Sequence, residues 1–298
     1  MNDTIPEASA DPATVSAAPE KESKGSAIWR EIKGLLWVLV AVLLFHSFVA
    51  KPFYIPSESM MPTLIKGDRL VVTKYPYGYS YVSPAPLHLL PFIHGRLFGR
   101  MPQRGDIVIL KPPAEDSDYI KRVIALPGDR IEVREGMVIL NGVPVKRVPE
   151  APAMIPIDDN IPCASDAEAP FQKTGPDGKR YCALPRFRET LPNGVSYDTI
   201  DVGYRPGIPD DFPEMTVPEG RVFVMGDNRD ESADSRVPES QNGLGGPIPW
   251  ENIGGRAEFI TFSYDGSTQY WNPISWFTAL RHGRAGVSLR PQHDAAGR

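Results

Sequence analysis

The sequence has few cysteines and no surplus of basic residues, and both absences exclude functions. Among its 298 residues are two cysteines, Cys163 and Cys182, which match neither a CxxC redox pair nor a four-ligand zinc site. The formal net charge of −5 provides no basic surface for nucleic acid. We therefore expect no nucleic acid partner, no metal and no cofactor.

The two cysteines lie in a polar stretch rich in proline and glycine. Residues 173–179, between them, have the composition of a turn. A disulfide that closes this hairpin is favoured if the domain faces an oxidising compartment. Two unpaired thiols in a loop are the alternative.

Histidine, the usual base that activates a serine, is also poorly placed. None of the five histidines lies in a turn typical of a catalytic loop: His46, His88, His94, His282 and His293. A Ser-His-Asp triad is therefore weakly supported. A lysine can replace histidine where burial disfavours its ammonium form and leaves a neutral amine near neutral pH.

Only one long apolar run is present, and it lies near the N-terminus. Residues 1–27 are mostly small, acidic or proline, and we expect a disordered cytoplasmic tail there. The next uncharged run, 34–50, has seventeen residues, the lower limit for a membrane-spanning helix. We predict a transmembrane signal-anchor helix over 28–51, with the following domain outside the cytoplasm.

Two other interpretations of this run are less well supported. A cleaved signal peptide would end in two small residues separated by one, but Phe48 occupies the first of those positions before Ala50. A buried core helix would usually show a polar face, which this run lacks. Basic residues before the run favour a cytoplasmic N-terminus, although those after it make the bias modest.

The remainder, 52–298, has the pattern of an antiparallel β domain. Short β-rich runs occupy 69–73, 106–110, 119–124, 131–133, 137–140, 221–225 and 257–262. Asn141-Gly142 follows one of them and is a strong hairpin signal. Without βαβ alternation or internal repeats, the predicted fold class is mainly β. Residues 150–215 show little periodicity and are interpreted as an insertion.

Three segments of this domain could carry chemistry. Ser59 lies in a proline-bounded apolar turn, Lys121 lies within a strand-like run, and a dense polar loop at 226–236 follows an apolar strand. Most such serines only form local hydrogen bonds, and most strand lysines point to solvent. In the loop, Arg229 and Arg236 offset Asp227, Asp230 and Asp234, which favours a self-neutralising ion-pair scaffold over a metal site.

Together these segments resemble the bacterial type I signal peptidases, which are membrane-anchored Ser/Lys proteases. The resemblance rests on four segments in the family's order: Pro56 to Leu64, Arg104-Gly105-Asp106-Ile107-Val108, Tyr119 to Arg122 with Leu126-Pro127-Gly128-Asp129, and Gly226 to Arg236. They cover a minority of the chain.

The resemblance implies a role for each matching residue. Ser59 is the implied nucleophile and Lys121 the general base. The Ser57 hydroxyl and the Ser59 backbone N–H would stabilise the oxyanion. Ser232 would orient the Lys121 amine, while Asp234 and Arg236 would pair to hold the loop. Bulky pocket walls would select small side chains, and the candidates are Phe53, Ile55, Met60, Leu64, Tyr119 and Ile120, each of which could equally be core.

The sequence departs from the family pattern in two places. Glu58 stands where a glycine is frequent, which could alter substrate preference. Residues 237–246 add a loop before Pro247, and its function is not assigned. Two apolar stretches, 87–98 and an aromatic cluster at 270–277, are candidates either for contact with membrane lipids or for internal packing.

These observations predict a single-pass endopeptidase of the inner (plasma) membrane with an extracytoplasmic catalytic domain. It would remove N-terminal signal peptides from exported preproteins, cutting after small residues in an Ala-x-Ala pattern. Two alternatives remain: a self-cleaving Ser/Lys protease of the repressor type, and a non-catalytic β domain that is tethered to a membrane and acts as a binding scaffold.

Overall fold

The structure is a computed structural model that describes residues 24–83, 95–113 and 117–293. The chain divides into two units, 1–42 and 43–298, and each is described by itself. Most of the expected tail over 1–27 and most of the apolar stretch 87–98 lie outside the described residues.

The first unit contains most of α1 (Lys24–Phe48), which starts ahead of the expected boundary at residue 28. Large apolar side chains project from it into solvent, among them Leu35, Trp37 and Leu39. Lys33 Nζ lies 5.3 Å from the centre of the Trp29 ring. In the part of the chain that the structure describes, no helix has both the length and the apolar character needed to cross a membrane.

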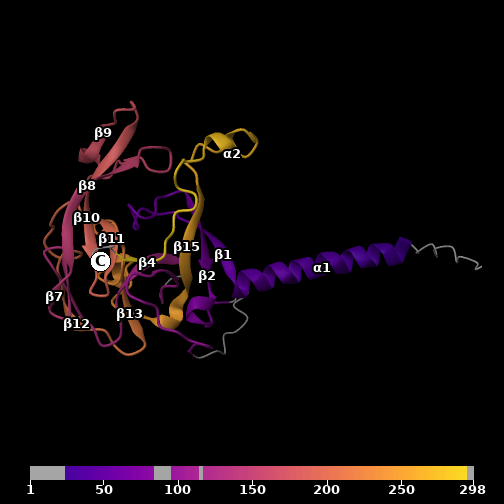
Figure 1. Ribbon diagram of the computed structural model, residues 1–298, viewed down its shortest axis with the longest axis horizontal. Coiled ribbons are helices and arrows are strands. Elements are labelled where there is room, and N and C mark those ends of the chain that lie inside the picture. The colour runs from indigo at the N-terminus through magenta and orange to yellow at the C-terminus, as the bar shows by residue number, and fades with distance from the viewer. Residues whose placement is uncertain (1–23, 84–94, 114–116, 294–298) are drawn as a thin grey trace, which may run out of the picture. The chain divides into compact units, whose positions relative to one another are not determined.

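The second unit is built mainly of antiparallel β-sheet, which confirms the predicted fold class (Figure 1). The largest sheet in the described residues has the order β1-β2-β15-β3-β4-β13-β14. Its strands are β1 (Ala50–Tyr54), β2 (Asp68–Thr73), β3 (Ile107–Leu110), β4 (Tyr119–Ala125), β13 (Arg221–Met225), β14 (Ile248–Pro249) and β15 (Ile253–Ser263). β3 and β4 are rich in Val and Ile and are buried along almost their whole length, which indicates that both of their faces are covered.

A second, four-stranded sheet contains the predicted hairpin. Its order is β12-β5-β6-β7, with β5 (Arg130–Arg134), β6 (Met137–Leu140), β7 (Val143–Pro144) and β12 (Phe212–Thr216). Leu140 pairs with Val143 across the turn. Asn141 and Gly142 both have positive φ, 55° and 81°, as a two-residue turn between twisted strands requires.

A third sheet occupies much of the segment 150–215, whose sequence shows little periodicity. It has the order β16-β11-β10-β8, with β9 paired to β10. The strands are β8 (Lys146–Pro156), β9 (Gln172–Thr174), β10 (Arg180–Thr190), β11 (Val195–Ile200) and β16 (Gln292–His293). In Figure 1, β8 and β10 form a long ribbon, consistent with their pairing from Tyr181↔Pro156 to Thr190↔Lys146. The segment is therefore a structural layer of the domain.

Short helices connect the strands. They are η1 (Tyr75–Tyr77), η2 (Ala169–Phe171), η3 (Glu239–Gln241), η4 (Trp250–Asn252) and α2 (Ser275–Thr278).

A disulfide joins Cys163 to Cys182, whose Cα atoms are 5.8 Å apart. It closes the hairpin in which β9 pairs with β10, and Gly175 and Lys179 form the intervening turn. Both cysteines pack in one apolar cluster with Met61 and Ile65. The third sheet and the turn after Ser59 thus share a core.

Candidate active site

The turn that carries Ser59 is attached to the polar loop 226–236. The Asn228 backbone N–H donates to the Ser59 carbonyl at 3.1 Å, and Asn228 Nδ2 donates to the Glu58 carbonyl at 3.3 Å. At Gly226 a Cβ atom would lie 2.4 Å from the Ser59 carbonyl oxygen and 2.2 Å from Ser232 Oγ. Only glycine allows this approach. Asn228 and Gly226 lie in the polar loop 226–236, but no local signal in the sequence indicates these roles.

Ser59 and Lys121, far apart in the sequence, are hydrogen-bonded in the structure. Lys121 Nζ lies 2.9 Å from Ser59 Oγ and 3.0 Å from the Ile120 carbonyl oxygen. Both side chains are buried, with 6% and 4% of their surface exposed. Lys121 extends from β4, in the middle of the largest sheet, so the strand fixes its position. The alternative of a lysine pointing to solvent is wrong for this residue.

Burial lowers the pKa of Lys121 to about 8. The negative charge of Asp234 opposes this shift, and the positive charge of Arg236 adds to it. At this pKa a substantial fraction of the amine is neutral in mildly alkaline solution. The pair can therefore transfer a proton from a serine hydroxyl to an amine.

The two other serines occupy different positions around the pair. Ser57 Oγ lies 3.4 Å from Ser59 Oγ on an exposed part of the turn. Ser232 is buried beside Gly226, and its Oγ has no hydrogen-bond partner among the described residues. The hydrogen bond expected between Ser232 and the Lys121 amine is therefore not made in this structure.

The polar loop is held by ion pairs, most of them different from those predicted. Arg236 pairs with Asp234 at 2.8 Å, as expected, and Asp234 also accepts the Gly226 N–H at 2.9 Å. The prediction that Arg229 neutralises other acids of the loop is wrong. Arg229 instead forms two hydrogen bonds of 2.6 Å each with Glu189 of β10.

The other two acids of the loop also pair outside it. Asp227 binds Arg122 of β4 at 2.6 Å, and Asp230 lies 3.3 Å from Arg205. The loop is thus joined to the third sheet and to the neighbour of Lys121. Partners so distant in the sequence carry no local signal.

The six residues predicted to form the walls of the substrate pocket do not lie in one group. Five of them share one apolar cluster: Phe53, Ile55, Met60, Leu64 and Ile120. Met60 and Leu64 are fully buried, so at least these two are core residues in this structure. Tyr119 packs against a different cluster, and its hydroxyl donates to the Asn242 carbonyl in the 237–246 loop at 3.0 Å.

Two carboxyl groups near the turn have raised pKa values. Burial raises the pKa of Glu58, with Lys66 opposing and Glu231 adding to the effect. Burial, and secondly the charge of Glu58, raise the pKa of Glu168 to about 7. Glu168 comes from the 150–215 segment, and nothing in its sequence surroundings indicated that it approaches this site.

Comparisons with known proteins agree with this geometry. Residues 28–262 match the family model "Signal peptidase, peptidase S26". The chain is 36% identical over 240 residues to a signal peptidase I of Rickettsia typhi (strain ATCC VR-144 / Wilmington), covering 78% of this chain and 80% of the relative. A signal peptidase I of Rickettsia prowazekii (strain Madrid E) is 37% identical over 243 residues, with the same coverage.

A solved signal peptidase I of Enterococcus faecalis V583 aligns with a TM-score of 0.28 and 23% identity, over 53% of this chain and 97% of that one. This likeness is too weak to add to the assignment, which rests on the sequence matches. The chain belongs to the signal peptidase family, peptidase S26, and is a serine endopeptidase that removes signal peptides.

Proposed function

We propose that signal-peptide removal by this chain runs through Ser59 as nucleophile and Lys121 as general base. The observation that carries the proposal is the 2.9 Å contact between Lys121 Nζ and Ser59 Oγ in a buried setting. The neutral amine accepts the Ser59 proton as Oγ attacks the scissile carbonyl. The resulting ammonium then donates a proton to the leaving amine.

The acyl-enzyme is then resolved by water that the same amine deprotonates. During both steps the developing oxyanion accepts hydrogen bonds from the Ser57 hydroxyl and the Ser59 backbone N–H. The Asn228 bonds to the turn support this assignment because they fix the backbone that presents these donors. Ser232, whose buried hydroxyl has no hydrogen-bond partner among the described residues, would orient the lysine by binding its amine.

The substrate is an extended signal peptide that docks as an added β-strand and is cut after small residues. Phe53 and Tyr119 are the wall candidates that keep exposed surface, and Ile120 is a nearly buried third. Bulky side chains at these positions leave room for alanine and exclude larger residues. Replacing Phe53 with alanine is expected to admit larger residues near the cut.

The chain is held at the inner membrane by α1, with its N-terminus in the cytoplasm and the catalytic domain outside. Apolar side chains exposed along α1 support this proposal, as does the family. The 270–277 cluster adds a lipid contact, since Tyr270 and Trp271 are 88% and 82% exposed. A photoreactive residue at position 271 should label lipid in proteoliposomes, whereas one at exposed Tyr204 should not. Equal labelling would contradict this contact.

Cleavage of a preprotein with an Ala-x-Ala site tests the nucleophile. The full chain in detergent should release a product that mass spectrometry places at that site, and Ser59→Ala should abolish release. Ser275→Ala, which removes a buried hydroxyl in α2, is the control and should cut normally. Cleavage by Ser59→Ala at the parent rate would exclude the mechanism, and a parent that does not cut would favour a tethered binding scaffold.

A further inference from the structure

An acidic residue lies within the turn that carries the nucleophile. Glu58 stands between Ser57 and Ser59, where a glycine is frequent in the family pattern. Its backbone carbonyl accepts a hydrogen bond of 3.3 Å from Asn228 Nδ2, so the backbone that carries its side chain is fixed relative to Ser59. The proposed mechanism uses the Ser57 hydroxyl and the Ser59 N–H, and it gives the Glu58 carboxyl no part.

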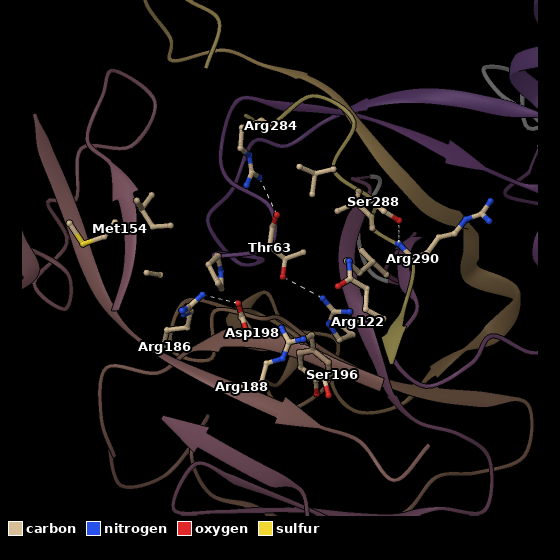
Figure 2. Close-up of a pocket in the computed structure, with 18 residues that line it drawn as sticks. Thr63, Arg122, Met154, Arg186, Arg188, Ser196, Asp198, Arg284, Ser288 and Arg290 are labelled. Atoms are coloured by element: carbon tan, nitrogen blue, oxygen red, sulfur yellow. Dashed lines mark hydrogen bonds and ion pairs between the residues drawn. The ribbon is translucent and has the colours of Figure 1, made fainter. Parts of the chain in front are cut away.

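The turn is also anchored at its other end, which limits how far Glu58 can move. Figure 2 shows Thr63 beside a cavity of about 380 Å³, between Arg284 and Arg122. The Thr63 carbonyl accepts from Arg284 Nη2 at 3.1 Å, and its Oγ1 accepts from Arg122 Nη2 at 3.4 Å. Thr63 Oγ1 also donates to Asp227 Oδ2 of the polar loop at 2.6 Å. A side chain on such a turn is positioned before any ligand arrives, which lowers the entropic cost of binding.

A second acidic residue reaches the turn from the disulfide loop 163–182. Glu168 directly precedes η2, and only 3% of its surface is exposed. Its Oε1 atom has no hydrogen-bond partner among the described residues. Burial raises the pKa of Glu168 to about 7, and the charges of Glu58 and Glu231 add to this effect, so the three carboxyls lie near one another. A buried oxygen that lacks a donor favours a ligand that supplies one.

The group formed by Glu58, Glu168 and Glu231 has little positive charge around it. Lys66 acts on Glu58 through its charge, but no ion pair joins it to any of the three carboxyls in the part of the chain that the structure describes. The arginines of the polar loop, Arg229 and Arg236, have other carboxylate partners. Three carboxyls thus face one ammonium, and the group is negative when its carboxyls are ionised.

The acidic group and the predicted pocket walls lie on different sides of the turn. Met60 packs in one apolar cluster with the wall candidates Phe53 and Ile120. Met61 packs in another cluster, with the disulfide of the loop that contains Glu168. A peptide whose residues before the cut lie against the walls therefore directs the residues after the cut toward the acidic group.

We propose that Glu58, Glu168 and Glu231 form a subsite for a lysine or arginine side chain at the first or second residue after the cut. The inference rests on the proposed role of Ser59. An ammonium group carries three N–H donors and a guanidinium group five, enough to contact more than one carboxyl and to supply the donor that Glu168 Oε1 lacks. An extended peptide advances about 3.3 Å per residue, so the residues nearest the cut are those within reach.

A metal ion fits this group less well than a basic side chain. Among the residues that the structure describes, no group of three or more His, Cys, Asp or Glu side chains could hold a metal ion. A larger cation with several separate donors does not need the carboxyl oxygens to converge on one point.

The test compares preproteins that differ at one of these two positions. Each carries lysine, glutamine or glutamate there, after the same Ala-x-Ala site, and the full chain cuts them in detergent at low salt. At one or both positions the parent should cut the lysine substrate with a kcat/KM about tenfold above that of the glutamine substrate, and the glutamate substrate should be slowest. Equal values at both positions would overturn the proposal.

Three variants assign the preference to the carboxyls. Glu58→Gln, Glu168→Gln and Glu231→Gln should each lower the ratio of kcat/KM for lysine over glutamine by about threefold or more, mainly through KM. Glu219→Gln, which removes an exposed glutamate just before β13, is the matched control and should keep the parent's ratio. A ratio that persists unchanged in all three variants would overturn the proposal.

A charge reversal keeps the test decisive if Glu168→Gln does not fold. Glu58→Lys should invert the order, so that the glutamate substrate is cut faster than the lysine substrate. A merely structural role of Glu58 would lower both rates alike, and that result would overturn the proposal. Because each variant is judged by a ratio between substrates, a general loss of activity cancels.

The same experiment separates this subsite from the proposed catalytic mechanism. If the parent cuts all substrates alike and Ser59→Ala cuts none, the mechanism stands and the subsite is wrong. If Ser59→Ala cuts at the parent rate, the mechanism is wrong and the subsite falls with it.

Discussion

Two lysines of this domain are buried to the same degree, and only one of them is placed for chemistry. Lys121 in β4 and Lys74 just after β2 each expose 4% of their surface. Burial is the main cause that lowers the pKa of each to about 8. By these two measures the residues cannot be distinguished.

Their hydrogen-bond partners separate them. Lys121 Nζ reaches a serine hydroxyl, whereas Lys74 Nζ donates to the backbone carbonyl of Ser83. A carbonyl has no proton to give, so a neutral Lys74 amine has nothing to activate. A lowered pKa makes a lysine available as a base, and the neighbouring group decides whether it is one.

The largest expected effect is the difference between the two lysine-to-methionine variants. Lys121→Met should reduce the rate of preprotein cleavage by about 10³-fold or more, because the serine loses its base. Lys74→Met should stay within a few-fold of the parent. Both are measured as kcat/KM on the same preprotein, and melting curves show whether each variant is folded. Similar losses of kcat/KM in both variants would mean that cleavage depends on a buried lysine in general and not on the contact between Lys121 and Ser59.

The next effect concerns the serine beside the nucleophile. Ser57→Ala should lower kcat by about 10²–10³-fold with little change in KM, as loss of one oxyanion donor does. Ser83→Ala removes a hydroxyl beside the other lysine and should leave kcat unchanged. A rise in KM without a fall in kcat for Ser57→Ala would assign Ser57 to substrate binding.

A smaller effect is expected on the pH profile. Because the base is the neutral amine, kcat/KM should rise about tenfold per pH unit below pH 8 and level off above it. Asp234 opposes the lowering of the Lys121 pKa, so Asp234→Asn should move the profile to lower pH. Lys74→Met should leave the profile in place. A profile that moves with Lys74→Met would mean that Lys74, and not Lys121, sets the pH dependence of kcat/KM.

The features that could be predicted from the sequence are those with a local signal. Alternating or continuous Val and Ile runs mark β2 to β6, and Asn141-Gly142 marks their hairpin. Ser59, Lys121 and the 226–236 loop could be singled out because their segments match a family in order and spacing. Each of these signals can be recognised without knowing which residues the fold brings into contact.

The third sheet and the ion pairs lacked such a signal. β8 contains Pro149 and Pro152, which speak against a strand, yet it lies at an edge where proline is tolerated. Glu189 is 40 residues from Arg229, so only the packing of β10 against the loop selects it over the nearer acids. Lys74 has no motif at all, and its burial results from the fold around it.

The smallest predicted effect is on stability, and it belongs to the lysine without a catalytic partner. The pKa of Lys74 is about 8 in the folded protein, compared with 10.5 for a free lysine side chain, which represents the unfolded chain. Below pH 8 both states carry the proton, and the folded state bears the full cost of a buried charge. Above about pH 8 the folded protein loses this proton while the unfolded chain still keeps it. The cost therefore falls as the pH rises and disappears near pH 10.5, where the unfolded chain loses its proton too. The free energy of unfolding of Lys74→Met should therefore exceed that of the parent most at pH 7, by on the order of 1 kcal/mol after allowance for solvent screening. The difference should be smallest near pH 10. Urea unfolding at both pH values measures the difference. An advantage that grows with pH would show that Lys74 is stabilised as the ammonium by the Ser83 carbonyl, and the two lysines would then differ in charge as well as in partner.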